Sequence, residues 1–210
     1  MSPENEMLVQ DWLLWLVANF FGYAFWFCLG ALPLVILGDR DNDFTGVLFL
    51  SSQGVMTGLA QWLVVIRWHI GQAGWWILAT AIGWPLGLFA GTAVVSRVNV
   101  VNEQAAIVVW AVLGASLGLT QWLVLRNKVE HAEWWIFAST ALWAISGFIG
   151  IKVIEVVNGP SVIVTSSTEL VVILTTWGLA ESIKGVVLVR LLHRPIPDSI
   201  SLASLTTAKH

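Results

Sequence analysis

The chain has 210 residues, of which 57% are hydrophobic and only 11% are charged. A soluble domain carries about a quarter charged residues, so this composition excludes a soluble globular protein. The net charge of −3 provides no basic surface for nucleic acid, and at roughly 20 apolar residues per crossing the length accommodates about six transmembrane helices in one membrane domain.

Six apolar stretches follow one another along the chain and predict six membrane-spanning helices. The acidic N-terminus lacks the basic segment and cleavage site of a secretory signal, so the first stretch is interpreted as a retained helix. The six stretches cover residues 12–37, 44–66, 75–95, 104–125, 134–151 and 170–192.

The remaining segments are predicted to be termini and loops. We expect a cytoplasmic N-terminal segment at 1–11, one all-α membrane domain at 12–194, and a disordered Ser/Thr-rich tail at 195–210. The longest loop, 152–169, is rich in Val, Ile and Thr, which favours an extended or interfacial segment. Cys28 lies inside an apolar run, so we expect a packed, unreactive thiol.

Positive charge is distributed unevenly between the two sides of the predicted membrane domain. If the six helices alternate in direction, the side with both termini carries six Lys or Arg residues and the other side carries three. The excess places both termini in the cytoplasm. The six are Arg67, Arg126, Lys128, Arg190, Arg194 and Lys209, and the three are Arg40, Arg97 and Lys152.

Two sequence elements recur along the chain. Gly-Leu-Ala-Gln at 58–61 returns as Gly-Leu-Thr-Gln at 118–121 and as Gly-Leu-Ala-Glu at 178–181, with an offset of 60 residues at each step. Between these copies, Ala-Gly-Trp-Trp-Ile-Leu-Ala-Thr at 73–80 matches Ala-Glu-Trp-Trp-Ile-Phe-Ala-Ser at 132–139. The pattern indicates an internal repeat.

The spacing of these elements predicts three tandem helix pairs, at about 12–68, 75–127 and 134–192. Because each pair crosses the membrane twice, all three pairs have the same orientation. This arrangement permits a pseudo-threefold axis along the membrane normal.

Glycines spaced by four residues mark several of the predicted helices. The GxxxG pattern lets helix backbones approach closely in lipid, where dispersion and hydrogen bonds drive association. A glycine inside a helix costs about 1 kcal/mol relative to alanine, so these glycines are expected at helix contacts. The expected packing positions are Gly54 and Gly58, Gly114 and Gly118, and Gly83 and Gly87.

The pairing of Gln-Trp-Leu-Val-(x)-Arg with Ala-x-Trp-Trp-Ile-x-Ala, over residues 58–147, resembles polytopic membrane proteins of bacteria, cyanobacteria in particular. The resemblance implies a bacterial inner membrane or a thylakoid membrane. It implies the architecture and transfers no activity, because no activity is established for that group.

Six polar side chains are predicted to lie at one level, about 9 Å inside the cytoplasmic boundary at 1.5 Å per residue. Two interpretations stay open. The side chains hydrogen-bond helices to one another, as polar groups in bundles routinely do, or they form a small intramembrane binding site. They are Gln61, Gln121 and Glu181 on the second helix of each pair, and Asn19, Thr80 and Ser139 on the first.

Glu181 is the ionisable member of this level. An ionisable residue inside a membrane span is a functional-site hypothesis by default, and Lys184, three residues later, is its expected partner on the same helix. The alternative is a structural, neutralised pair in which Lys184 extends toward the lipid headgroups.

Aromatic and histidine side chains give weaker indications. Trp75, Trp76, Trp134 and Trp135 begin their helices beside basic loops, where amphipathic indoles form an interfacial belt. A stacked-aromatic site for a pigment or quinone is the alternative, with His69 or His131 as an axial ligand. No metal site is predicted, because the four histidines lack metal-ligand spacing.

Motifs of hydrolases, nucleotide-binding proteins and metalloenzymes are absent from the sequence. The prediction is therefore a non-enzymatic membrane protein, with two hypotheses for its role. In the first, the polar level binds or conducts a small solute or ion. In the second, the chain is an accessory or assembly subunit that packs against other membrane proteins, lipids or pigments, for example in a photosynthetic membrane.

Overall fold

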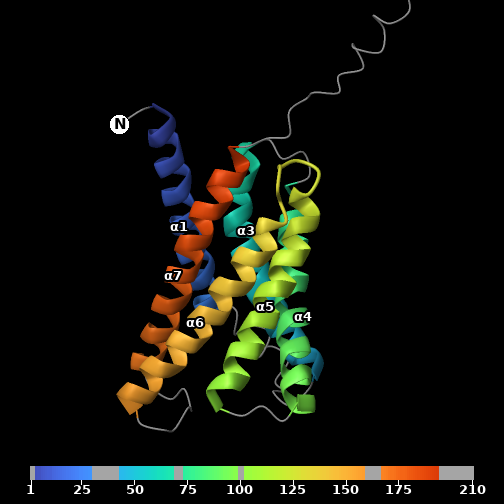
Figure 1. Cartoon of the computed structure of the whole chain (residues 1–210), viewed down its shortest axis with the longest axis vertical. Helices are drawn as coiled ribbons and strands as arrows, with labels where there is room; N and C mark the ends of the chain where they lie inside the picture. The colour runs from blue at the N-terminus through green and yellow to red at the C-terminus, as the bar shows by residue number, and fades with distance from the viewer. Residues whose placement is uncertain (1–2, 30–42, 69–72, 99–101, 159–166, 194–210) are drawn as a thin grey trace, which may run out of the picture.

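The computed structural model of the chain describes residues 3–29, 43–68, 73–98, 102–158 and 167–193. The regular structure in this part of the chain is helical (Figure 1). The helices are α1 (Pro3–Leu29), α3 (Asp43–Val65), α4 (Trp75–Val98), α5 (Asn102–Leu125), α6 (Trp134–Asn158) and α7 (Ser167–Leu192), with a single 3-10 turn, η1 (Ile66–Trp68), directly after α3.

Four of these helices are long and apolar enough to cross a membrane. The apolar segments are Asn5–Trp26 in α1, Trp75–Val98 in α4, Gln104–Leu125 in α5 and Trp134–Val156 in α6. A helix satisfies its own backbone hydrogen bonds and can therefore lie in hydrocarbon without water. Over its described residues, the chain is a helical membrane protein.

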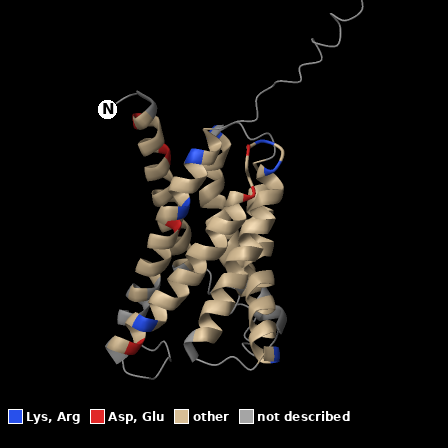
Figure 2. Ribbon diagram, in the orientation of Figure 1, with Lys and Arg blue, Asp and Glu red and all other residues tan. Residues whose placement is uncertain are grey.

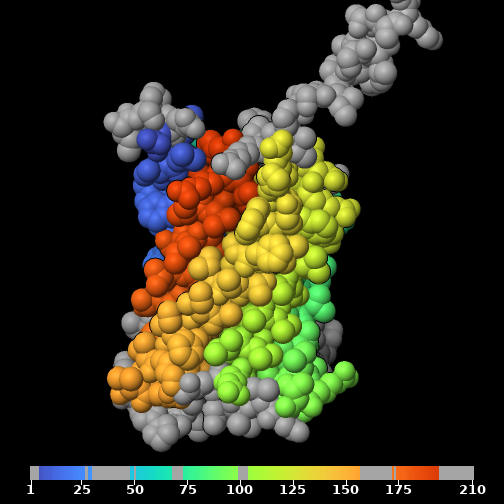
Figure 3. Space-filling model, viewed as in Figure 1, coloured from blue at the N-terminus to red at the C-terminus, as the bar shows by residue number. Residues whose placement is uncertain are grey.

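The helices pack in chain order and close on themselves. Each contacts the next, from α1 through α3, α4, α5 and α6 to α7, and α7 packs back against α1. Figure 1 shows them running along the long axis of the molecule, and Figure 3 shows α6 lying obliquely between α5 and α7 on one face. The bundle therefore encloses a common interior to which every helix contributes.

The outer surface of the bundle is apolar. Phe20 on α1 and Phe137 on α6 are 70% and 63% exposed, and Leu63 on α3 is 62% exposed. Figure 2 shows most charged residues toward the ends of the helices. Exposed phenylalanine and leucine with charges at the two ends is the distribution that a bilayer requires.

The Ala-x-Trp-Trp element forms the same turn at the start of two helices. In α4 the backbone N–H of Trp76 donates to the carbonyl of Ala73 at 3.0 Å, and in α6 the N–H of Trp135 donates to Ala132 at 3.0 Å. This turn sets the phase of each helix. As a result the second tryptophan points inward, while the first, Trp75 or Trp134, is more than half exposed.

Glycines permit close backbone contact between neighbouring helices. A Cβ atom at Gly54 of α3 would lie 2.5 Å from the Thr80 carbonyl oxygen of α4, and one at Gly114 of α5 would lie 2.5 Å from the Ser139 carbonyl oxygen of α6. Between α4 and α5, a Cβ at Gly87 would lie 2.6 Å from the Cα of Leu113. The other predicted packing glycines, Gly58, Gly83 and Gly118, are similarly confined.

Two helices extend beyond their predicted ends. α1 begins at Pro3, so most of the predicted N-terminal segment is helical; the Trp12 indole N–H bonds to the Ser182 carbonyl at 2.9 Å and ties this part of α1 to α7. α6 continues through 152–158, the first part of the predicted loop, which was expected to leave room for an extended or interfacial segment. An ion pair between Lys152 and Glu155 at 3.1 Å, spaced i,i+3, stabilises that last stretch.

Cys28 is exposed on α1, so the expectation of a packed thiol is wrong. An apolar sequence context does not distinguish a buried position from one on the apolar outer surface. The predicted tail, 195–210, and the remaining part of the predicted loop, 159–166, lie outside the described residues.

The close contact at Gly114 predicts a specific sensitivity to substitution. Gly114→Ala places a methyl group against backbone that cannot move independently, so we expect destabilisation by about 1–3 kcal/mol, as for overpacking. Gly178→Ala is the matched control, because nothing lies within 4 Å of a Cβ there, and the better helix propensity of alanine makes that change neutral or stabilising by up to about 1 kcal/mol. Thermal unfolding of the two variants in detergent measures the difference. Equal tolerance of both substitutions would contradict the observed packing.

Candidate functional site

Three tryptophans meet at the centre of the bundle. Trp15 of α1, Trp76 of α4 and Trp135 of α6 each have 0% exposure. Their ring centroids lie 6.1 to 6.2 Å apart in all three pairs, with two of the pairs edge to face. Aromatic pairs in this range contribute about 0.5–1.5 kcal/mol beyond their burial. We call these three residues the tryptophan triad.

Each indole N–H of the tryptophan triad donates to a neighbouring helix. Trp76 Nε1 donates to Gln61 Oε1 of α3 at 2.9 Å, and Trp135 Nε1 donates to Gln121 Oε1 of α5 at 3.0 Å. Trp15 Nε1 donates to the backbone carbonyl of Glu181 of α7 at 3.0 Å. The triad thus joins α1 to α7, α4 to α3 and α6 to α5 at one level.

Polar side chains form a layer beside the triad because each follows a triad tryptophan by four residues on the same helix face. Asn19, Thr80 and Ser139 stand at these positions of α1, α4 and α6. They are 0% to 2% exposed. The other side chains of the layer are Gln61 of α3, Gln121 of α5 and Glu181 of α7.

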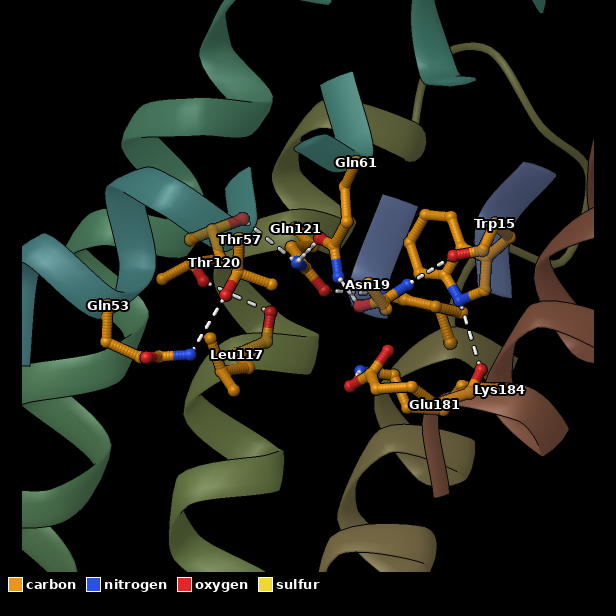
Figure 4. A network of polar contacts seen from close by, with 12 residues as sticks. Trp15, Asn19, Gln53, Thr57, Gln61, Leu117, Thr120, Gln121, Glu181 and Lys184 are labelled. Atoms are coloured by element: carbon orange, nitrogen blue, oxygen red, sulfur yellow. Dashed lines mark hydrogen bonds and ion pairs between the residues drawn. The ribbon is translucent and has the colours of Figure 1, made fainter. Parts of the chain in front are cut away.

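The polar layer has three sectors, which lie between α1 and α3, between α4 and α5, and between α6 and α7. Hydrogen bonds join the side chains in the first two. Between α1 and α3, Gln61 Nε2 donates to Asn19 Oδ1 at 2.7 Å, and Asn19 Nδ2 donates to the Trp15 carbonyl at 2.8 Å. Between α4 and α5, Gln121 Nε2 donates to Thr80 Oγ1 at 3.0 Å, with Gln61 Oε1 at 3.4 Å. With the Trp76 and Trp135 indoles, the two glutamines are therefore held between four neighbours in one continuous network; Figure 4 shows Asn19, Gln61 and Gln121 within it.

The third sector, between α6 and α7, differs in chemistry. Glu181 and Lys184 form an ion pair at 2.7 Å and are 2% and 1% exposed. Among the described residues they are the only charged side chains that are buried. The second carboxylate oxygen, Glu181 Oε2, and the hydroxyl of Ser139 have no hydrogen-bond partner within the described part of the chain. We call Glu181, Lys184 and Ser139 the charged sector.

Aromatic rings surround the ammonium group of the charged sector. Lys184 Nζ lies 5.0 Å from the ring centroid of Trp135 and 5.9 Å from that of Trp143. Both rings belong to α6 and flank Ser139 by one turn on either side. Cation–π attraction partly replaces the hydration that Lys184 loses.

A second group of aromatic rings closes the other side of the polar layer. Trp110 and Trp143 stack at 5.6 Å with an interplanar angle of 12°, and Trp84 meets Trp143 edge to face at 5.5 Å. Trp177, one turn before Glu181, contacts Tyr23 of α1 at 5.6 Å. The polar layer is thus enclosed between the tryptophan triad and these rings, which exclude water and lower the local dielectric.

The predicted site residues are therefore brought together unequally. Gln61, Gln121, Asn19 and Thr80 belong to one network, whereas the Glu181 side chain joins Lys184, and only its backbone carbonyl reaches the network through Trp15. The alternative in which Lys184 extends to the headgroups is wrong, because the ammonium turns inward to the carboxylate and the α6 rings.

The interfacial interpretation is wrong for two of the four tryptophans and stays a prediction for the other two. Trp75 and Trp134 are exposed at 58% and 60%, but Trp76 and Trp135 are buried in the triad. A sequence signal for this existed: Trp15, Trp76 and Trp135 stand four residues before Asn19, Thr80 and Ser139 and therefore share their helix faces.

The loop between α5 and α6 holds the other cluster of titratable groups. His131 adopts a left-handed backbone, φ 56°, and its Nδ1 lies 3.3 Å from Glu133 Oε1. The backbone hydrogen bond that Glu133 accepts lowers the pKa of its carboxyl group, helped by His131. Among the described residues no group of three or more His, Cys, Asp and Glu gathers as a metal site would require; His69 lies outside them.

Comparison of the chain with protein-family models, with curated proteins and with solved structures finds no match. The resemblance to bacterial polytopic membrane proteins therefore stays a prediction, and the function is argued from the geometry of the site.

The network predicts unequal costs for two buried glutamines of α3. Gln61→Leu leaves Asn19 Oδ1 and Trp76 Nε1 without their partners, so we expect a loss of roughly 2–3 kcal/mol, since an unsatisfied buried group costs about 1–3 kcal/mol. Gln53 is equally buried but donates to Thr57 of its own helix, so Gln53→Leu is the matched control, with an expected loss of about 1 kcal/mol or less. Thermal unfolding in detergent compares them, and an equal loss would refute the clamping role of Gln61.

Proposed function

We propose that this chain is a non-enzymatic membrane protein that binds a small solute or ion at the charged sector of its polar layer. The observation that carries the proposal is the pair of buried oxygen atoms without partners, Glu181 Oε2 and Ser139 Oγ. Glu181 belongs to the buried ion pair with Lys184, and the Lys184 ammonium lies 5.0 and 5.9 Å from the rings of Trp135 and Trp143, one helical turn on either side of Ser139. The ligand-binding residues are Gln61, Gln121, Glu181, Lys184, Asn19, Thr80 and Ser139, with Glu181 as the primary ligand contact.

The energetics favour a functional origin for this ion pair. Each of two charges that are withdrawn from water loses several kcal/mol of solvation free energy. The attraction between the two charges rarely exceeds this loss. An apolar pair of similar size would stabilise a bundle in lipid at least as well. Neutral amides and hydroxyls are sufficient to join helices, as the other two sectors of the layer show. A buried ion pair is not needed for that purpose.

The chemistry of the atoms without partners narrows the ligand class. A carboxylate oxygen accepts hydrogen bonds and binds cations, and a serine hydroxyl accepts or donates. The ligand is therefore a proton, a small cation or a solute that carries an N–H or O–H donor. Lys184 supplies the balancing charge when the ligand leaves.

A second function, from a different class, is supported by the outer surface. Phe20, Phe21 and Phe25 of α1 are 50% to 70% exposed and follow one another with ring contacts of 5.8 and 6.2 Å. Such an aromatic face suits an accessory or assembly subunit that packs against another membrane protein, a lipid or a pigment. An absorption spectrum and mass spectrometry of the natively purified protein distinguish the two roles, because the accessory role requires a partner or pigment to co-purify.

The same proposal covers the arrangement in the membrane. All six helices span the bilayer as three helix pairs related by a pseudo-threefold axis, with GxxxG faces between them. The supporting facts are the 60-residue offset of the sequence elements and the lengths of α3 and α7, 23 and 26 residues, each above the roughly 20 residues that a crossing needs.

Substitution of Glu181 tests ligand binding. Glu181→Gln removes the carboxylate charge and leaves the buried Lys184 ammonium without its counter-charge, so we expect the free energy of unfolding to fall by about 3–5 kcal/mol. We expect the same change to abolish the thermal shift produced by protons, alkali cations or ammonium in the wild type, and any flux of these ions in proteoliposomes.

The matched control for this experiment is Glu155→Gln, which breaks the other i,i+3 Lys–Glu pair, Lys152–Glu155, at a partly exposed site. It should leave ion-dependent shifts and flux unchanged. Absence of any shift in the wild type, or retention of the shift in Glu181→Gln, would overturn ligand binding at this carboxylate.

Cysteine labelling tests the topology. In a Cys28→Ser background, a cysteine in place of Arg97 should react with an impermeant reagent added outside intact cells, and a cysteine in place of Asn127 should be protected. Both positions are exposed at helix ends. The reverse pattern would place the termini outside, and equal reactivity would exclude the alternating six-helix arrangement.

A further inference from the structure

Two apolar grooves run along opposite flanks of α7 and share one arginine. The groove between α6 and α7 has a volume of about 480 Å³, and the groove between α1 and α7 has a volume of about 420 Å³. Arg190 lines both grooves. The first is otherwise lined by Trp134, Phe137, Ala138, Ala141, Val187 and Leu191, and the second mainly by Leu8, Val9, Trp12, Val186 and Val189.

Arg190 is an exposed cation in the last turn of α7. Its guanidinium group makes no ion pair or hydrogen bond with any residue of the described part of the chain. Apart from Arg190, the groove linings are aliphatic and aromatic, with Asn5 as the one other polar residue, in the groove between α1 and α7. An unpaired cation at the end of two apolar grooves complements a molecule that combines one anionic group with two apolar arms.

We propose that one anionic diacyl phospholipid binds around α7, with its phosphate at the Arg190 guanidinium and one acyl chain in each groove. Arginine is suited to this contact because its planar fork donates two N–H groups to phosphate oxygens. The exposed indole of Trp134 lines the α6 groove, and tryptophan favours the headgroup level of a bilayer. The site is separate from the polar layer, so its occupancy does not depend on ligand binding at Glu181.

A neighbouring surface provides a comparison. The groove between α1 and α3 has a volume of about 490 Å³ and is also apolar, with Arg67 among its lining residues. Arg67 borders this one groove, whereas Arg190 borders two. A diacyl lipid held through both chains is therefore expected at Arg190, and Arg67 is a matched arginine for the experiment.

Native mass spectrometry of the whole chain in nonionic detergent measures the site directly. The probes are dioleoyl phosphatidylglycerol, dioleoyl phosphatidylcholine with the same acyl chains, and inorganic phosphate. We expect one phosphatidylglycerol to be retained at concentrations where phosphatidylcholine and phosphate are not. Arg190→Gln should weaken this binding about fivefold, the contribution of one basic residue near an anionic lipid surface, whereas Arg67→Gln and Arg97→Gln should leave it unchanged.

A second variant tests the acyl-chain contacts without touching the charge. Ala141→Trp fills the α6 groove from an exposed position and should weaken phosphatidylglycerol binding while leaving the unfolding temperature of the lipid-free protein unchanged. Equal retention of phosphatidylcholine, binding of phosphate alone, or loss of binding in Arg67→Gln with full binding in Arg190→Gln would each overturn the proposal.

Discussion

A membrane interior offers no water to a polar side chain, so each buried N–H group must find its acceptor inside the protein. The tryptophan triad meets this requirement across helix boundaries: the indoles of Trp15, Trp76 and Trp135 donate to α7, α3 and α5. Close glycine contacts bring these helices near enough for the bonds to form. The position of every side chain in the polar layer follows from this interlocking of rings and amides.

The same constraint explains why the charged sector stands apart. The amide nitrogen and oxygen of Gln61 and of Gln121 each have a hydrogen-bond partner inside the network. Glu181 and Lys184 neutralise one another, but Glu181 Oε2 and the Ser139 hydroxyl have no hydrogen-bond partner in the described part of the chain. A bundle that required only stability would place neutral groups there as well. The departure from the other two sectors is therefore the strongest functional indication in the molecule.

The sequence predicted the depth of the polar layer in the bundle better than it predicted which side chains surround that layer. The helical class and the shared level of Gln61 and Gln121 were predictable, since a recurring spacing places recurring residues at one depth. The burial of Trp76 was missed, because Trp75 and Trp76 are adjacent residues of one type and both were assigned to the interface; the spacing of Trp76 to Thr80 separates them, and the turn at Ala73 is where the structure fixes the inward ring. The inward direction of Lys184 depends on rings of α6, a contact that spacing within α7 does not encode.

A double-mutant cycle between Trp76→Phe and Gln61→Leu tests most directly whether the indole–amide bonds clamp the bundle. Removal of either partner breaks the 2.9 Å bond between α4 and α3, so the second substitution should cost less once the first is present. The interaction predicts a coupling free energy of unfolding of about 1–2 kcal/mol, within the range for residues that share one hydrogen-bond network. Additive effects, equal within roughly 0.5 kcal/mol, would show that the rings pack beside the amides without binding them.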